Sequence, residues 1–189
     1  KDSEGLWDKR YSDNPVLNPP SEFLEEFEQY LPDHGTCVDI AGGNGRNALW
    51  FAKKGYITSV IDISSVALNQ ATKSAQSQKV ELECIYWDIE KNLLPPERTW
   101  DIALLTLFLN RGVLLTANEY LNSQGILLFA QPTKKNLERH QHPSEQFLLD
   151  PSEIFEISEN LAGMEILHVD EGWRRSERHE AWLACKKII

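Results

Sequence analysis

Short apolar runs alternate with amphipathic stretches along most of the chain. The runs predict strands at residues 37–40, 57–62, 80–86, 101–107 and 125–131. Between them, apolar residues at helical spacing predict helices near residues 48–52, 64–75 and 112–121. This alternation indicates a doubly wound α/β sheet. The nearly unbroken apolar runs DIALLTLFL and GILLFA are typical of central parallel strands buried on both faces.

The stretch before the first strand divides into an arm and a helix. Residues 1–20 are polar and rich in turn formers, but they carry Trp7, Arg10 and Tyr11 in the run LWDKRY. These aromatic side chains either pack on the domain as a strap or close over a ligand. Apolar residues at helical spacing follow from Phe23 to residue 31, with Ser21 as a candidate N-cap. Residues 1–35 are thus expected to form an arm and a helix, and a possible lid.

The C-terminal third departs from the alternating pattern. Residues 132–144 contain Lys, His, Arg and two Pro, which indicates a long surface loop after a central strand, where α/β folds place substrate contacts. A helix is expected at residues 151–159, entered through Asp150 or Ser152. The charged segment EGWRRSERH joins two strands expected at residues 164–169 and 180–187. It is too short for a helical crossover, so these strands are predicted to form an antiparallel hairpin.

Length, charge and cysteine use limit the functional classes. A chain of 189 residues suits a single domain, residues 1–189. A net charge of −10 argues against nucleic acid or an anionic membrane surface and favours a small-molecule partner, with the protein a monomer or weak homodimer. The longest apolar run is too short to span a membrane and no signal-peptide core is visible, so we expect a cytoplasmic protein. The three cysteines lack metal-ligand spacing, and no metal is expected.

The stretch TCVDIAGGNGRN, residues 36–47, reads as a strand, a tight turn and the start of a helix. Its glycines, Gly42, Gly43 and Gly45, lack Cβ atoms, so the backbone can adopt positive φ angles and a ligand can approach closely. Such turns bind dinucleotides and S-adenosylmethionine (SAM) alike, and some are only tight turns. The motif alone therefore indicates a nucleotide-type site without naming its ligand.

Three carboxylates stand at comparable places of successive strands and bear on that choice: Asp39 in the first strand, Asp62 at the end of the second and Asp88 just after the third. Asp62 lies 17 residues after Gly45, where an acceptor for ribose hydroxyls belongs in either kind of site. Asp39 argues against a pyrophosphate, which needs an electropositive cradle, and suits a ligand with an ammonium and a sulfonium group. Asp88 is placed to accept from an adenine amino group, although an Asp at a strand end is commonly a cap or turn former.

The motifs VDIAGGNGR, VIDIS, YWDIEK and WDIALLTLFLNR, followed by the hairpin, resemble those of class I SAM-dependent methyltransferases. More narrowly, LWDKRYSDN, NPPSEFL, FLLDPSEI and HVDEGW resemble the small methyltransferases of the tellurite-resistance and thiopurine type. The resemblance implies a three-layer, Rossmann-like sheet of seven strands, mostly parallel with the last strand antiparallel. It also implies SAM as cofactor, S-adenosylhomocysteine as product, and a cofactor site across the ends of the first three strands.

Carried onto this sequence, the resemblance places cofactor contacts residue by residue. It implies that the turn holds the methionine part, Asp62 the ribose, and Asp88 with Ile89 the adenine, while Thr106 and Leu107 face the methyl group. The full set of expected cofactor contacts is Trp7, Arg10, Asp39, Ala41, Gly42, Gly43, Gly45, Arg46, Asp62, Ile63, Asp88, Ile89, Thr106 and Leu107. Ala41 stands where the family usually has Gly, and Asn110 where related sequences often have His. The methyl group of Ala41 either crowds the cofactor or only requires an α- or β-region backbone.

Methyl transfer to an acceptor that is already anionic, such as a thiolate or a chalcogen oxyanion, needs no general base. Proximity and alignment then supply most of the catalysis. The expected acceptor and catalytic contacts are Arg111, His142 and Tyr11, with Arg139 and His140 as further candidates. Two alternatives remain open at this point: a SAM- or nucleotide-binding protein without transferase activity, and an NAD-dependent oxidoreductase.

Overall fold

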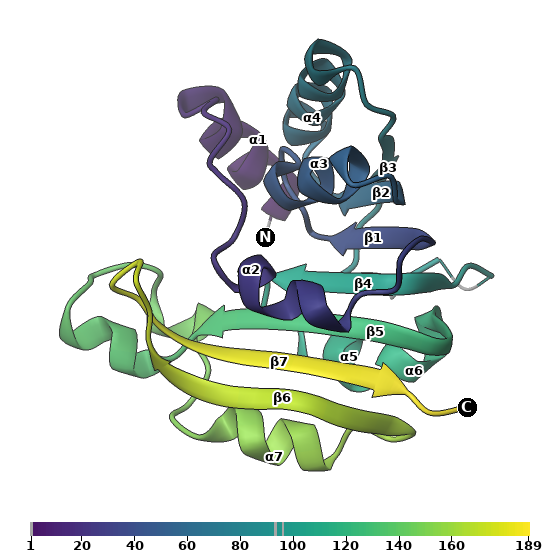
Figure 1. Cartoon of the computed structure of the whole chain (residues 1–189). Helices are drawn as coiled ribbons and strands as arrows, with labels where there is room; N and C mark the ends of the chain where they lie inside the picture. The colour runs from purple at the N-terminus through teal and green to yellow at the C-terminus, as the bar shows by residue number, and fades with distance from the viewer. Residues whose placement is uncertain (1, 93, 96) are drawn as a thin grey trace.

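The computed structural model describes residues 2–92, 94–95 and 97–189. Seven strands form one sheet in the order β3-β2-β1-β4-β5-β7-β6 (Figure 1). The strands are β1 (Thr36–Ile40), β2 (Ile57–Asp62), β3 (Glu83–Tyr86), β4 (Trp100–Thr106), β5 (Leu121–Pro132), β6 (Met164–Trp173) and β7 (His179–Lys187). β7 lies between β5 and β6 and is antiparallel to both, while β1 to β5 pair in parallel. The predicted sheet is confirmed.

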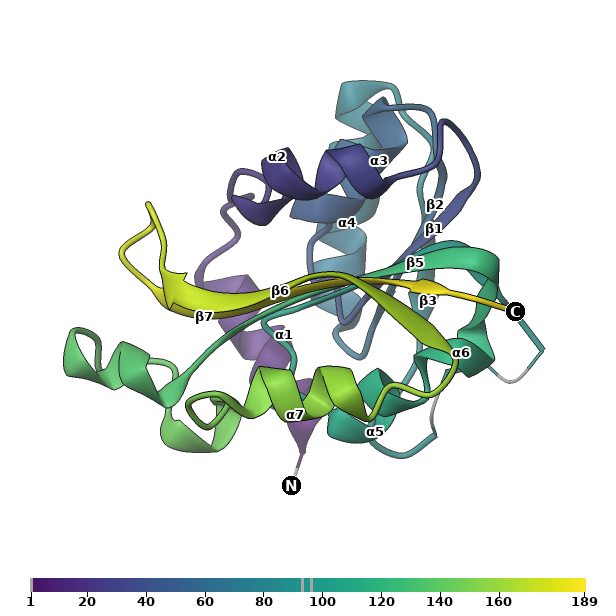
Figure 2. The same cartoon turned by 60° about the horizontal axis from the view of Figure 1, so that its bottom comes forward.

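Helices cover both faces of the sheet, as Figure 2 shows with the sheet between two helical layers. One layer holds α2 (Phe23–Phe27), the short helix η1 (Glu28–Tyr30), α3 (Arg46–Lys53) and α4 (Ser65–Gln78). The other holds α5 (Arg111–Leu115), α6 (Ala117–Tyr120) and α7 (Glu153–Glu159). Alternate residues of the central strands feed the two cores; in β4, for example, Ala103 and Leu105 pack toward α5 to α7, and Ile102 and Leu104 toward α2 and α3.

Apolar content explains why the central strands were predicted within a few residues. β4 is buried over almost its whole length, so no polar face interrupts the run. β5 begins earlier than predicted, at Leu121, because the polar residues 122–124 also belong to the strand. The predicted strand at residues 80–86 is shorter, since only Glu83–Tyr86 pair with β2. The predicted helix at residues 112–121 is two short helices, α5 and α6, separated at Thr116.

The predicted N-terminal arm is wrong in one respect, because Ser3–Asp13 form a helix, α1. None of the residues of α1 is buried, so the helix needs no apolar face, and the periodic apolar pattern that predicts a helix is weak here. Ser21 is not the N-cap of α2: Glu22 is, and no side chain caps that end. Instead Ser21 exchanges hydrogen bonds with Asn47, whose side-chain oxygen accepts from the Ser21 amide at 2.8 Å and whose side-chain nitrogen donates to Oγ at 3.0 Å.

The C-terminal hairpin is confirmed, with strands longer than predicted, so that only residues 174–178 form its turn. The expected surface loop after β5 contains two helical turns, η2 (Lys134–Glu138) and η3 (Glu145–Phe147). Thr133 and Asn136 in this loop are buried. In Figure 1 α1, this loop and the β6–β7 turn all lie on the left, at the carboxyl ends of the parallel strands.

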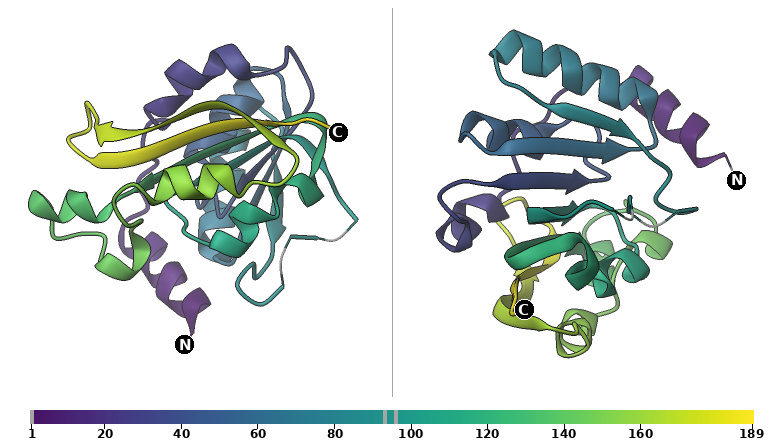
Figure 3. Two further views of the ribbon diagram at one scale, coloured as in Figure 1. Left: turned by 90° about the horizontal axis from the view of Figure 1, so that it is seen from below. Right: turned by 90° about the vertical axis from the view of Figure 1, so that its right-hand side faces the viewer.

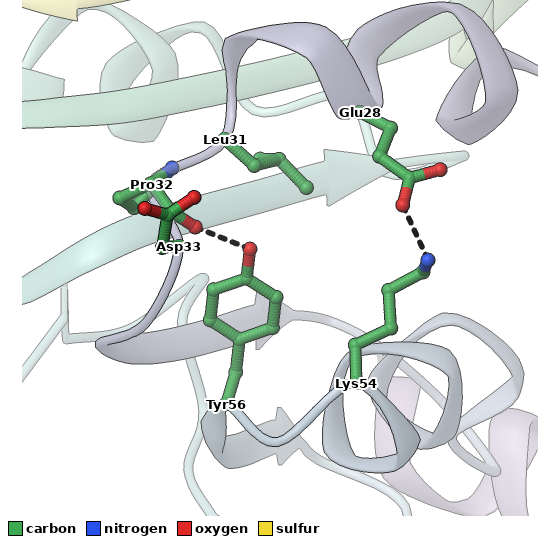
Figure 4. A pocket seen from close by; sticks show the side chains of 6 residues that line it. All are labelled: Glu28, Leu31, Pro32, Asp33, Lys54 and Tyr56. Carbon is green, nitrogen blue, oxygen red and sulfur yellow. Dashed lines mark hydrogen bonds and ion pairs between the residues drawn. The ribbon is translucent and has the colours of Figure 1, made fainter.

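The opposite edge of the sheet carries an open hollow of about 320 Å³ (Figure 4). Across it Glu28 faces Lys54 in an ion pair, and the Tyr56 hydroxyl donates to the carbonyl of Pro32. This hollow lies at the amino ends of β1 and β2, far from the glycine turn, and has no part in the site described next. Within the described ranges, no helix has both the length and the apolar character needed to cross a membrane.

Candidate active site

The glycine turn connects β1 to α3 with three successive departures from ordinary backbone. Gly43 and Gly45 have φ angles of +60° and +87°, and Ala41 has a φ angle of 54°. The expected α- or β-region backbone at Ala41 is therefore wrong: this alanine occupies the left-handed region that its usual glycine counterpart tolerates better. The turn is also tightly covered, since a Cβ atom built on Gly43 would lie 2.0 Å from the hydroxyl of Tyr11.

Asp62 at the end of β2 ties the turn to the neighbouring strand. Its Oδ2 accepts from the amide of Gly43 at 2.8 Å, and its Oδ1 accepts from the amide of Ser64 at 2.8 Å. Burial raises the pKa of Asp62, and these amide hydrogen bonds act in the opposite direction. Each oxygen retains a lone pair, so the side chain can still accept from a ribose diol. Ile63, beside it, is partly exposed.

Asp39 lies beneath the turn. Its side chain is 1% exposed, and neither carboxyl oxygen has a hydrogen-bond partner of normal geometry among the described residues. The amide of Ala48 is close enough to lower the pKa without meeting hydrogen-bond geometry. Burial dominates and raises the pKa of Asp39 to about 7, against the opposing charge of Arg46. The expected charged partner for an ammonium group is thus close to half protonated at neutral pH.

Helix α1 lies over the cradle and beside α4 (Figure 3). Near its start, Ser3 donates to Glu90 at 3.1 Å. In its middle, the Asp8 Oδ1 accepts from the Ser64 hydroxyl at 2.6 Å and from the Val66 amide at 3.2 Å. Near its end, the Tyr11 carbonyl accepts from Gln70 at 2.9 Å. These contacts run from the loop after β3 to the glycine turn, so α1 spans the length of the predicted cofactor site.

The aromatic side chains of α1 face this site in different ways. Tyr11 is partly buried, and burial raises its pKa to about 12, with the charge of Asp62 adding to the effect. The hydroxyl is therefore protonated at neutral pH and can donate a hydrogen bond. Trp7 is partly exposed and stacks under Arg10, whose Cζ lies 5.0 Å from the ring centroid. Arg10 itself is exposed.

The predicted adenine contacts are already engaged within the protein. Asp88 Oδ1 accepts from the amides of Glu90 and Lys91, and Oδ2 pairs with the Lys91 ammonium at 2.9 Å. The Lys91 hydrogen bond holds the pKa of Asp88 below its usual value. These contacts are those of a turn former, the alternative left open for this residue. Ile89 is buried in the core. Their contact with adenine stays a prediction.

The end of β4 lies next to the glycine turn through Asn47. Asn47 is 1% exposed, and its side-chain nitrogen lies 3.3 Å from the hydroxyl of Thr106 as well as binding Ser21. Thr106 is therefore held from the direction of α3. Leu107 follows in the left-handed region, with a φ angle of 52°, and is exposed. The two residues expected to face the methyl group thus lie at the carboxyl edge of the sheet. Thr106 is held by Asn47, and Leu107 is exposed to solvent.

Two basic side chains that were not among the expected acceptor contacts, Arg46 and Arg178, lie toward the glycine turn. Arg46, expected only as a cofactor contact, opens α3, and its nearest charged groups include Asp39, Glu180 and Arg178. Arg178 lies at the end of the hairpin turn, directly before β7. Among the described residues Arg46 makes no ion pair, and its one hydrogen bond is a long one of 3.4 Å to the Pro19 carbonyl. Arg178 is exposed at the start of β7.

The three expected catalytic residues do not lie together. Tyr11 lies on the turn, but Arg111 is bound by Glu153 of α7, with its Nη2 2.9 Å from Oε2. That carboxylate raises the pKa of Arg111 further. His142 is exposed in the loop after η2, where its backbone carbonyl accepts a hydrogen bond from Asn136. His140 binds the Glu177 carbonyl, and Arg139 stacks 3.8 Å from the centroid of Trp173.

A buried histidine escaped the sequence reasoning. His179, at the start of β7, has its Nδ1 2.7 Å from the hydroxyl of Thr133 and packs edge-on against Trp173. Burial lowers the pKa of His179, so it is neutral at pH 7. Its position at the carboxyl edge depends on the pairing of β7 with β5, which no local pattern shows. Within the described chain, no three His, Cys, Asp or Glu side chains converge to hold a metal ion.

Comparisons with known proteins agree with this geometry. Residues 37–122 match the family model of a methyltransferase domain. TehB from Haemophilus influenzae has the same fold with a TM-score of 0.71 at 16% identity, over 96% of this chain and 67% of that one. A protein studied for conversion of a disulfide bond into a thioacetal group during echinomycin biosynthesis gives a TM-score of 0.72 at 15% identity, over 97% and 91%. A SAM-dependent methyltransferase from Methanosarcina mazei gives 0.68 at 18% identity, over 91% and 100%. No curated protein sequence matches the chain.

At these identities the structural matches establish the fold, and the family model covers the cofactor turn. Together they show that residues 37–122 resemble a methyltransferase domain and that the chain has the fold of class I SAM-dependent methyltransferases, as the motifs indicated. The matched structures include SAM-dependent methyltransferases, so S-adenosylmethionine is the cofactor with which the site is compared. The residues present fit that cofactor, because the turn has no Cβ at Gly43, the Asp62 carboxylate retains acceptor capacity, and both oxygens of buried Asp39 lack partners.

Proposed function

We propose that this protein is a SAM-dependent methyltransferase and that it acts on a small acceptor whose nucleophile is anionic or soft, such as a thiolate or a chalcogen oxyanion. The observation that carries the proposal is Arg46. Its guanidinium is largely removed from water and makes no ion pair within the described chain. A positive charge in such a position favours an anionic ligand, since the attraction is weakly screened there.

Neighbouring charges support this view of the acceptor end. Arg178 adds a second positive charge, and Glu180 a carboxyl whose pKa is raised by burial. The Glu180 side chain accepts from the indole nitrogen of Trp182 at 2.8 Å, which holds it in place. Two guanidinium groups face the carboxyls of Glu180 and Asp39, and burial raises the pKa of both carboxyls, which favours their neutral forms. We therefore assign Arg46 and Arg178 the role of orienting the acceptor anion.

The remaining residues contribute position rather than acid–base chemistry. SAM supplies a methyl group on a positively charged sulfur, which a deprotonated nucleophile can accept without a general base. Thr106 and Leu107 line the end of β4, and Tyr11 with α1 excludes water from the turn. Alignment of this kind can contribute about 7–11 kcal/mol to catalysis. One protein of similar fold is studied for converting a disulfide into a thioacetal, which is chemistry at sulfur and supports a soft acceptor here.

A labelled-methyl transfer screen across thiols, tellurite, selenite, phenols and small carboxylic acids tests the proposal. We expect product with at least one anionic or thiol acceptor. Arg178→Ala should then raise the KM for that acceptor about tenfold, the loss of one charge-assisted contact, while the Kd for SAM is unchanged.

Arg175→Ala is the matched control, since Arg175 points to Glu22 and Glu25 instead and should behave as wild type. Transfer only to neutral phenols would contradict the proposal. SAM binding with no product on any acceptor would favour the alternative of a binding protein without transferase activity.

A further inference from the structure

Asp39 combines near-complete burial with a lack of partners. Its side chain is 1% exposed, and neither oxygen meets hydrogen-bond geometry with any described group. A carboxylate in such a position lacks the donors that would stabilise its charge, so the neutral acid is favoured. Buried acids without partners are uncommon in folded proteins and call for a physical reason.

The charged and titratable groups around Asp39 come from every element packed against it. Arg46 of α3 favours the carboxylate, whereas Asp62 of β2 opposes it. Tyr11 of α1 and Cys37 of β1 also face it, and both are neutral because burial raises their pKa values. One cation therefore opposes burial and a second carboxyl, and the pKa of Asp39 settles at about 7. A second cation nearby would lower it.

The backbone of the glycine turn lies directly against the Asp39 carboxyl. A Cβ atom on Gly42 would lie 2.5 Å from Cγ of Asp39, so only bare backbone separates the carboxyl from the cradle. In a SAM site the methionine part, with its ammonium group, lies along this turn. The low dielectric that disfavours a lone carboxylate would strengthen its attraction to an ammonium group.

We propose that Asp39 gives up its proton when the cofactor binds, so that cofactor affinity is linked to pH. The Asp39 O–H bond breaks, its electron pair stays on the carboxylate, and the proton passes to solvent while the ligand ammonium becomes the counter-ion. Charge is conserved, because the proton released balances the negative charge formed. The inference rests on the cofactor assignment and adds to it that binding is coupled to the release of a proton from a buried acid.

The expected signature is quantitative. Below about pH 7 binding must expel the proton, so the association constant should rise roughly tenfold per pH unit and level off above that pH. At about pH 6, some 0.9 proton should be released per ligand bound. The ligand's own amino group titrates near pH 7.7–8.0 in reference peptides, so measurements at about pH 5.5–7 avoid it.

Calorimetry in two buffers of different ionisation enthalpy counts the released protons directly. S-Adenosylhomocysteine is the probe, since it carries the ammonium group, and 5′-methylthioadenosine is the matched ligand that lacks it. We expect proton release with the first ligand and none with the second. Asp39→Asn, which removes the titrating group at constant size, should abolish the release while thermal melting checks that it folds.

Binding of S-adenosylhomocysteine without proton release at about pH 6, or equal release with both ligands, would overturn the inference and leave the cofactor assignment intact. Undiminished release from Asp39→Asn would do the same. No binding of S-adenosylhomocysteine at all would overturn the cofactor assignment and this inference with it. If the variant does not fold, the comparison of the two ligands on the wild-type protein decides alone.

Discussion

The substitution Asp39→Asn should stabilise the ligand-free protein at high pH. Wild-type folding buries an acid whose pKa rises from 3.8 to about 7. Above pH 7 that acid is charged in the core without hydrogen bonds of normal geometry. Asparagine has the same shape and no charge, so it avoids this cost. The gain should be absent only where the wild-type carboxyl is neutral in both folded and unfolded chains.

The magnitude follows from the two pKa values. Their difference of about 3 corresponds to about 4 kcal/mol at 1.36 kcal/mol per pKa unit. The folded chain holds the proton more tightly, so wild-type stability from this group is full below about pH 4 and is lost as the pH rises toward 7. Between about pH 5 and pH 8 the wild type should lose about 2.5 kcal/mol that Asp39→Asn keeps.

Urea denaturation followed by tryptophan fluorescence at about pH 5, 6, 7 and 8 gives the difference between the two proteins. Asp101→Asn is the control, because hydrogen bonds from Asn122 and Thr36 hold the pKa of Asp101 below its usual value. Both of its pKa values then lie below this range, so its effect should not vary with pH. A pH-independent difference for Asp39→Asn would refute the reasoning, since it would mean that Asp39 does not titrate there.

Two further predictions concern the backbone of the turn. Gly43→Ala places a methyl group 2.0 Å from the Tyr11 hydroxyl at a φ angle of +60°, whereas Gly55→Ala, at +93°, meets no atom within 4 Å. Gly55→Ala should lower the free energy of unfolding only by the backbone strain, about 1–2 kcal/mol. Gly43→Ala should lower it clearly more, as measured by urea denaturation, and should reduce the hydrogen-exchange protection of α1. Equal losses for the two variants would show that α1 does not rest on the turn. Ala41→Gly should change the free energy of unfolding by less than about 0.5 kcal/mol, because relief of the left-handed backbone offsets the lost methyl contact. The control Ala48→Gly, at a buried helical position, should lower it by about 1 kcal/mol or more. A matching loss at both positions would contradict the observed φ angle of Ala41.

The sheet could be predicted from the sequence because the apolar residues of its central strands indicate that these strands are buried. β4 is a nearly continuous apolar run, and β1 and β2 are mainly buried runs that end at the glycine turn and at Asp62, so their approximate bounds follow from the pattern. Helix α1 could not be predicted in this way, since it has no buried face. Its position depends on single contacts with partners far along the chain, such as Asp8 with Ser64 and Tyr11 with Gly43. Local pattern carries no trace of them.

The candidate site likewise contains residues that local sequence pattern could place and residues whose neighbours depend on tertiary contacts. Residues next to the turn, such as Asp62, lie where strand ends place them, because parallel strands bring their carboxyl ends to one edge. The acceptor side was less predictable. Arg111 and Glu153 form an ion pair between α5 and α7, which the one-dimensional spacing does not reveal. Arg178 is close enough to affect the pKa of Arg46, and the hairpin turn that carries it is held against α2 by hydrogen bonds of Arg175 and Ser176 to Glu22.

The position of β7 also dictates the order in which the protein can be assembled. β6 is made before β7 but has no other strand as a neighbour, and β7 joins it to β5 through pairs such as Pro132 with Glu180 and Ile126 with Lys186. During synthesis, β5 is therefore an open edge and its apolar face is half covered until β7 arrives. A nascent chain stalled in that interval would present a long unpaired strand to its neighbours, which makes this the stage of biogenesis most exposed to aggregation and to chaperone capture.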